Sequence, residues 1–99
     1  MTMNKTQNGN DLTIALEGRL DTTTAPELEQ ELKRSLTGID HLTFDFSKLE
    51  YISSAGLRVL LSAQKSMYSK GGMKITHVNE IVMEVFEVTG FTDILTIDS

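Results

Sequence analysis

Two hydrophobic periods alternate along this chain, and their order restricts the fold more than any other feature of the sequence. Between residues 12 and 16 large apolar side chains recur at every second position, which is typical of a strand with one buried face. Between residues 28 and 36 leucine recurs at every fourth position, which is typical of an amphipathic helix. Similar patterns follow one another to the end of the chain. This order predicts an α/β domain with a small mixed sheet of about four to five strands, covered by about three to four helices.

Capping and turn residues mark the ends of these segments. Thr24 to Glu27 has the pattern of a capping box with proline in the first turn, and Asn79 is a typical helix-capping residue. Gly38, the Gly71-Gly72 pair and Gly90 follow the expected helices and stop them. The expected strands are residues 3–7, 12–17, 42–46, 73–78 and 91–97, and the expected helices are residues 25–37, 54–70 and 80–89.

The length and charge of the chain exclude several classes of protein. Its 99 residues suffice for a single domain, placed at residues 1–99, with one core between two packed layers. The net charge of −5 and the scattered basic residues argue against binding to nucleic acid or to an anionic membrane. No apolar run is long enough for a membrane span, and the absence of cysteine excludes disulfides and thiolate metal sites. We expect a cytoplasmic protein without a signal peptide.

The stretch from Asp45 to Leu61 is the most informative part of the sequence. An apolar strand pattern ending at Phe46 leads into a short polar loop, after which Ser53 and Ser54 stand directly before a helix pattern. A hydroxyl at that position lies beside backbone N–H groups that have no partner inside the helix, at the positive end of the helix dipole. Such a hydroxyl either caps the helix or carries a phosphate that the helix terminus stabilises. Our hypothesis is a switch in which both states occur at different times.

Two neighbouring residues bear on that hypothesis. Gly56 falls in the first turn of the expected helix, where glycine costs about 1 kcal/mol relative to alanine, and a closely approaching partner would explain that cost. Asp21 ends an earlier strand segment, and it would lie beside the serines if the two strands are neighbours. A carboxylate there would orient the hydroxyl or assist a metal–nucleotide complex, but it would repel a phosphate already in place.

Motifs for catalysis and metal binding are weak. Ser62 to Lys65 fits the S-x-x-K pattern of acyl-enzymes, but it falls inside an amphipathic helix, and the companion motifs S-D-N and K-T-G are missing. His41 and His77 are far apart in the sequence, and neither belongs to a metal-binding motif. We therefore expect no enzyme activity, no metal and no cofactor.

Two segments resemble the signature segments of the STAS domain family, and within it the stand-alone bacterial anti-sigma-factor antagonists. These segments are Leu16 to Asp21 and Asp45 to Leu57. The resemblance extends over nearly the whole chain and is most specific just before the second helix. In that family the loop reads Asp-Ser-(Ser/Thr)-Gly-Leu, and its first serine is phosphorylated. Ser54 matches that serine and Ala55 matches the second small residue, whereas Ser53 stands where the family has aspartate.

The resemblance implies a partner switch in a monomer or weak dimer. The unphosphorylated protein would bind an anti-sigma factor that is itself an ATP-dependent serine kinase, and would thereby free a sigma factor. Phosphorylation would release the complex, and a metal-dependent serine phosphatase would reset it. The implied phosphorylation site is Ser54, with Ser53 as the alternative acceptor because the usual carboxylate is missing there. The implied partner-binding residues are Asp21, Ser53, Ser54, Ala55, Gly56 and Leu57.

Two other functions are compatible with the sequence. A STAS subunit of a transporter or of another regulatory complex would use the same surface without a phosphorylation cycle. A small serine-dependent enzyme would use Ser53 or Ser54 as its nucleophile, although no base or oxyanion-stabilising group is recognisable beside them.

Overall fold

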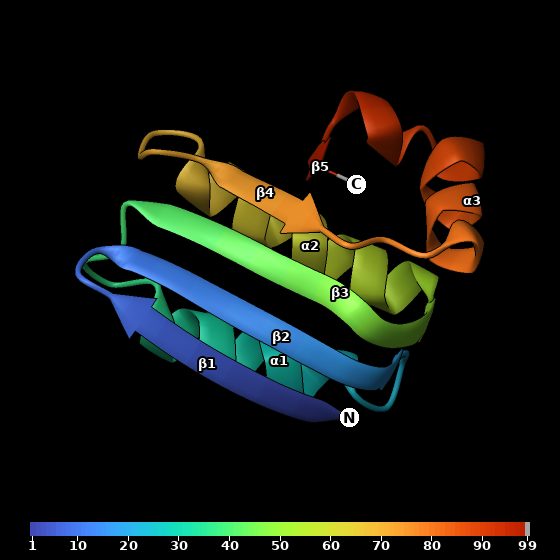
Figure 1. Ribbon diagram of the computed structural model, residues 1–99, viewed down its shortest axis with the longest axis horizontal. Coiled ribbons are helices and arrows are strands. Elements are labelled where there is room, and N and C mark those ends of the chain that lie inside the picture. Colours follow the sequence, from blue (N-terminus) through green and yellow to red (C-terminus); the bar gives the residue numbers. More distant parts are fainter. Residues whose placement is uncertain (99) are drawn as a thin grey trace.

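The computed structural model describes residues 1–98, which form a five-stranded sheet and three α-helices (Figure 1). The strands are β1 (Thr2–Asn8), β2 (Asp11–Leu20), β3 (His41–Ile52), β4 (Met73–Thr76) and β5 (Thr96–Asp98). The helices are α1 (Ala25–Ser35), α2 (Ser54–Met67) and α3 (Glu80–Thr89), and a 3₁₀ turn, η1, follows at Phe91–Asp93. The predicted α/β class is confirmed. Within residues 1–98 no helix has the length and apolar character needed to cross a membrane.

The strands lie in the sheet in the order in which they occur in the chain. β1 runs antiparallel to β2, whereas β2, β3, β4 and β5 run parallel to one another, so the sheet is mixed as predicted. Parallel neighbours need a crossover connection, and each of the three helices supplies one. Figure 1 shows α1 and α2 behind the sheet, and α3 near the end where β3 finishes and α2 begins. The ends of β2 and β3 that lead into α1 and α2 therefore meet on one side of the domain.

The core lies between the sheet and the helices and consists of apolar side chains. The alternation predicted for β2 is confirmed, since the three large apolar residues between Leu12 and Leu16 are buried. On β3 the ring centroids of Phe44 and Phe46 are 5.8 Å apart, and the ring of Phe46 is 6.4 Å from that of Phe86 on α3. The helices contribute Ala25, Leu28, Leu32, Leu57, Val59, Leu60, Ala63, Met67, Val82 and Phe86. The buried ring of Phe86 attaches α3 to the sheet.

β3 is longer than the sequence predicts, and it contains two extra residues relative to β2. The shifts appear between successive pairs, from Ala15–Asp45 to Glu17–Lys48 and from Gly18–Leu49 to Arg19–Tyr51. After Phe46 the next buried residues of the strand are consequently Leu49 and Ile52, at intervals of three positions instead of two. Irregularities of this kind interrupt the two-residue period on which a strand prediction depends. The predicted polar loop directly after Phe46 is therefore wrong, and the strand continues to Ile52.

The predicted capping box at the start of α1 is also wrong. Thr24 has helical backbone angles and makes no capping hydrogen bond, because its hydroxyl donates to the carbonyl oxygen of Arg19 at 2.8 Å. The carboxylate of Asp21 replaces it, since Oδ1 accepts hydrogen bonds from the backbone N–H groups of Thr23 and Thr24 at 3.0 and 3.1 Å. A residue that precedes the expected cap thus organises the entry into α1.

α2 and β4 end earlier than predicted, whereas β2 ends where the sequence indicates. β2 ends at Leu20, within the segment from Gly18 to Asp21 that was predicted to end this strand. α2 ends at Met67, before the predicted end at residue 70, and the following Tyr68 is 84% exposed. β4 ends just before His77, whose positive φ of 59° is incompatible with a strand.

The caps predicted for α3 are confirmed. The side chain of Asn79 accepts a hydrogen bond from the backbone N–H of Val82 at 2.8 Å, and Gly90 ends the helix with φ of 80°. The final strand is shorter than predicted, because residues 91–93 form η1 and only Thr96–Asp98 pair with β4.

Replacing Phe86 by alanine should lower the free energy of unfolding by about 3–5 kcal/mol, because it removes a buried ring that packs on Phe46. Val88 on the same helix is 81% exposed, so Val88→Ala should change this free energy by less than about 0.5 kcal/mol. Urea denaturation followed by circular dichroism measures both values. Equal effects of the two substitutions would contradict the packing of α3 against the sheet.

Candidate functional site

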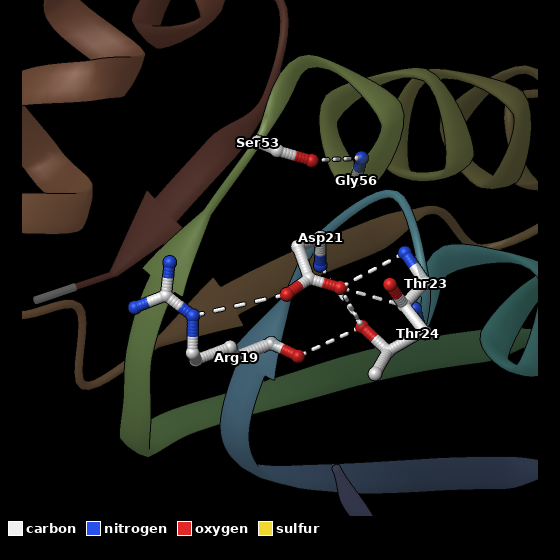
Figure 2. Close-up of polar contacts among 6 residues, drawn as sticks. All are labelled: Arg19, Asp21, Thr23, Thr24, Ser53 and Gly56. Carbon is white, nitrogen blue, oxygen red and sulfur yellow. Dashed lines mark hydrogen bonds and ion pairs between the residues drawn. The ribbon is translucent and has the colours of Figure 1, made fainter.

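The ends of β2 and β3 converge and bring together site residues from both strands. Leu20 pairs with Ile52 across the parallel strands, and the backbone N–H of Ser53 donates to the carbonyl oxygen of Leu20 at 2.9 Å. Asp21 and Ser53 therefore follow paired residues at the same end of neighbouring strands. Figure 2 shows Asp21 where the chain turns toward α1 and Ser53 at the entrance to α2. β2 and β3 are therefore neighbours, which is the condition under which the sequence places Asp21 beside the serines.

The two serines occupy different positions at the start of α2. Ser53 is the capping residue, with φ of −102° and ψ of 176°, and its hydroxyl oxygen accepts a long hydrogen bond of 3.4 Å from the backbone N–H of Gly56. Ser54 is the first residue of the helix, and its side chain is exposed. Its hydroxyl makes no hydrogen bond to any other residue of the described range 1–98. The structure therefore assigns the cap, which the sequence leaves open, to Ser53.

Asp21 carries a fixed negative charge at this site. Besides the two backbone N–H groups, the hydroxyl of Thr24 lies 3.3 Å from Oδ1, and Nε of Arg19 lies 3.7 Å from Oδ2 (Figure 2). These contacts, the backbone hydrogen bond from Thr24 foremost, hold the pKa of Asp21 below its ordinary value of 3.8. The Arg19 guanidinium also lies over the ring of Tyr51, 4.4 Å from its centroid. The carboxylate is thus ionised at neutral pH.

Gly56 is needed for packing inside the chain. A Cβ atom at this position would lie 2.8 Å from a side-chain carbon of Leu20, 2.8 Å from one of Ile52 and 3.0 Å from the Leu20 carbonyl oxygen. Gly56 is buried, so the first turn of α2 rests directly on the ends of β2 and β3. The close approach that this glycine permits is that of the helix to the sheet, and the partner contact suggested by the sequence is not needed to explain it.

Some of the predicted partner-binding residues are accessible at the surface, and the others are buried beneath them. Ser54 is exposed, and Asp21, Ser53 and Ala55 are partly exposed. We call these four residues the switch surface. Gly56 and Leu57 are buried beneath it, so they can act on a partner only by fixing the position of the turn.

A shallow groove between α1 and α2 adds residues that the sequence did not single out. It has a volume of about 250 Å³ and is lined by residues that include Thr22, Pro26, Ala55 and Arg58. Arg58 is exposed and forms no ion pair within residues 1–98. It lies four residues after Ser54 on the same helix, a spacing at which side chains are neighbours. That spacing is the signal by which Arg58 could have been found in the sequence.

The two histidines are engaged away from the serines. Nδ1 of His41 lies 2.9 Å from a carboxylate oxygen of Asp11, and Nδ1 of His77 lies 3.5 Å from one of Asp45. Neither histidine hydrogen-bonds to a serine of the switch surface within the described chain. In the same range no group of three or more His, Cys, Asp or Glu side chains is placed to hold a metal ion. The site offers a free hydroxyl, a fixed carboxylate and a helix N-terminus.

In a comparison with known proteins, a single family model matches nearly the whole chain. The family model for the STAS domain matches residues 2–99. The proposed anti-sigma factor antagonist BtrV of Bordetella bronchiseptica is 35% identical over 88 residues, which cover 87% of this chain and 76% of that protein. The anti-sigma-B factor antagonist of Bacillus subtilis is 29% identical over 94 residues, which cover 94% of this chain and 86% of that protein.

The anti-sigma factor antagonist SpoIIAA of Bacillus has the same fold. Its unphosphorylated form has a TM-score of 0.77 at 13% identity, and the match covers 99% of this chain and 88% of SpoIIAA. Its phosphorylated form has a TM-score of 0.75 at 14% identity, and the match covers 99% of this chain and 92% of SpoIIAA. At such identities the likeness concerns the fold alone.

Gly56→Ala should lower the free energy of unfolding by up to about 2 kcal/mol. Overpacking against Leu20 and Ile52 costs about 1–3 kcal/mol, which exceeds the roughly 1 kcal/mol that alanine gains over glycine in a helix. Ser66→Ala, at an exposed position of the same helix, is the matched control and should change the free energy by less than about 0.5 kcal/mol. Chemical denaturation measures both. A stabilised Gly56→Ala variant would show that the contact is not tight.

The Asp21 carboxyl group should titrate below its ordinary pKa of 3.8, because the hydrogen bonds from Thr24 and Thr23 favour its ionised form. The resulting stabilisation is fully present above the pKa of the unfolded chain and is lost as the pH falls through the lower pKa of the folded state. Asp21→Asn should therefore reduce stability at neutral pH, and its difference from wild type should shrink below about pH 4. Carboxyl NMR titration and denaturation at several pH values test this, and a pKa at or above the ordinary value would refute it.

Proposed function

The chain belongs to the STAS domain family, and we propose that it acts as an anti-sigma-factor antagonist whose partner binding is controlled by phosphorylation of Ser54. The observation that carries this proposal is the free, exposed hydroxyl of Ser54 at the first residue of α2. The relatives in Bordetella and Bacillus bear the name of such antagonists, which supports the same role here. SpoIIAA is known in an unphosphorylated and a phosphorylated form, so this fold accommodates the modification in that protein.

Ser54 suits phosphorylation better than Ser53 does. The hydroxyl of Ser53 accepts the capping hydrogen bond from Gly56 and is partly buried, so a phosphate there would disturb the first turn of α2. A phosphate on Ser54 would stay in solvent, close to the unpaired N–H groups of that turn, where the helix dipole contributes about 0.3–1 kcal/mol. Arg58 lies one turn further along the helix and offers a positive charge. The free protein should therefore tolerate the modification without losing its fold.

The Asp21 carboxylate acts in the opposite sense. It is ionised and lies on the same side of the domain, so it repels a phosphate on Ser54. The phosphate should consequently extend into solvent, where it protrudes from the switch surface. In the unmodified protein the same carboxylate is available to a donor group of the partner.

The proposed partner is an anti-sigma factor that is also an ATP-dependent serine kinase. The unphosphorylated switch surface binds this kinase in the cytoplasm and frees a sigma factor. Transfer of the γ-phosphate of ATP to the Ser54 oxygen, with release of ADP and of the hydroxyl proton, then ends the complex. A metal-dependent serine phosphatase hydrolyses the phosphoserine and restores the binding form.

A phosphate is a sufficient physical reason for release. It adds about −1.5 to −2 charge and three acceptor oxygens to a surface that otherwise presents one small hydroxyl. In the complex this group must lose its water and occupy space filled by the partner. A penalty of about 4 kcal/mol weakens binding roughly a thousandfold. The same charge in the free protein stays hydrated, so the switch acts on binding and leaves folding nearly unchanged.

Ser54→Asp should weaken binding to the kinase by about a hundredfold to a thousandfold, because it places a permanent charge on the switch surface. Ser54→Ala should retain binding and lose phosphorylation. Isothermal titration calorimetry with the serine-kinase anti-sigma factor of the same genome measures the affinity, and mass spectrometry after incubation with ATP locates the phosphate. The unfolding free energies of both variants should stay within about 0.5 kcal/mol of wild type.

Ser53→Ala is the matched control for this pair. It removes the cap of α2 and should cost about 0.5–1 kcal/mol of stability, while phosphate is still incorporated at Ser54. Phosphate found on Ser53 alone would transfer the proposed role to that residue. A protein that never acquires phosphate, and whose Ser54→Asp variant binds as wild type does, would instead favour a STAS subunit that uses this surface without a phosphorylation cycle.

A further inference from the structure

Exposed apolar side chains are concentrated on α3 and the segment after it. Ile81 and Val88 on α3 are 61% and 81% exposed, and Ile94, which directly follows η1 in the chain, is 44% exposed. They are three of the four large hydrophobic residues with high exposure within residues 1–98, and the fourth, Tyr68, follows the far end of α2. Ile81, the partly exposed Val85 and Val88 have the i, i+4, i+7 spacing of one helical stripe.

An acidic stripe runs beside this apolar stripe. Glu80, Glu84 and Glu87 are all exposed, and none of them forms an ion pair within the described chain. The helix contains no lysine, arginine or histidine that would neutralise them. α3 thus presents an apolar stripe edged on one side by uncompensated negative charge.

The start of α3 lies close to the switch surface. The side-chain amide of Asn79 donates to the carbonyl oxygen of Leu49 at 2.7 Å, which ties the start of α3 to the last part of β3. Leu49 precedes Ser53 by four residues, which corresponds to at most about 14 Å along a strand. Figure 1 shows α3 beside the end of the sheet at which β3 passes into α2. A typical protein interface covers about 800 Å² on each partner, a patch roughly 30 Å across, so one partner can reach both features.

We infer that the outer face of α3 is a second docking surface for the serine-kinase anti-sigma factor, continuous with the switch surface. This inference rests on the proposed function. The kinase would seat the stripe of Ile81 and Val88 in an apolar groove edged by lysine or arginine side chains, which would face the three glutamates. This contact does not involve Ser54, so through it the kinase can bind the chain before the phosphate is transferred.

Charge argues for a basic partner over a second copy of this chain. In a twofold dimer the same patch faces itself, so the three glutamates of one α3 would lie against those of the other. The net charge of −5 adds to that repulsion. A basic rim on a different protein turns the same charges into an attraction.

Binding of the purified full-length chain to the purified kinase of the same genome tests this inference. The double variant Ile81→Ser/Val88→Ser should bind at least tenfold more weakly, and Glu84→Lys/Glu87→Lys should bind at least tenfold more weakly at low salt, with a reduced dependence on salt. All four side chains are exposed, so circular dichroism and the unfolding midpoint should match wild type. Tyr68→Ser, 84% exposed at the far end of α2, is the matched control and should bind as wild type does.

The outcomes separate this inference from the proposed function. In one outcome the wild-type protein binds the kinase, Ser54→Asp abolishes binding, and both α3 variants bind as tightly as wild type. This result would refute the α3 docking surface and leave the proposed function intact. Failure of the wild-type protein to bind the kinase at all would overturn both. Sedimentation that reveals a wild-type dimer, dissociated by Ile81→Ser/Val88→Ser, would assign the face to a second copy and overturn the inference.

Discussion

The contact of Leu20 with the first turn of α2 determines the geometry of the whole site. The Leu20 carbonyl oxygen accepts a hydrogen bond from Ser53, and its side chain lies where a side chain at Gly56 would otherwise stand. Asp21 follows Leu20 directly, so one residue positions the carboxylate and the serines at the same time. A free hydroxyl on a loop would have many orientations, whereas Ser54 emerges from a helix that is seated on the sheet.

The two adjacent serines have different roles: Ser53 caps the helix, and Ser54 presents a free hydroxyl. Ser53 completes the hydrogen bonding of the helix terminus, and this frees the hydroxyl of Ser54 from any structural duty. Because Ser53 has no carboxylate, Asp21 supplies the carboxylate of the switch surface, brought there by the neighbouring strand. The proposed modification of Ser54 would therefore alter the outside of the molecule, while the contacts that hold α2 in place would persist.

Local patterns made much of the fold predictable, and long-range pairing explains most of what was missed. The strand–helix order, the caps of α3 at Asn79 and Gly90, and the serines before α2 were all recognisable from residues close in sequence. The extension of β3 was not, because its register depends on a strand some thirty residues earlier. Asp21 could be placed beside the serines only on the condition that their strands pair, and the packing reason for Gly56 required the three-dimensional contact itself.

The two extra residues in β3 decide how the chain enters α2. Phe46, Leu49 and Ile52 are all buried at intervals of three positions, because each extra residue is taken up as an irregularity opposite β2. Deletion of one residue between Phe46 and Leu49 would restore the two-residue period and leave both side chains on the buried face. The strand would, however, lose the local bend and added twist of such an irregularity. The irregularities therefore determine the direction from which the serines approach the helix, and the choice of buried residues does not depend on them.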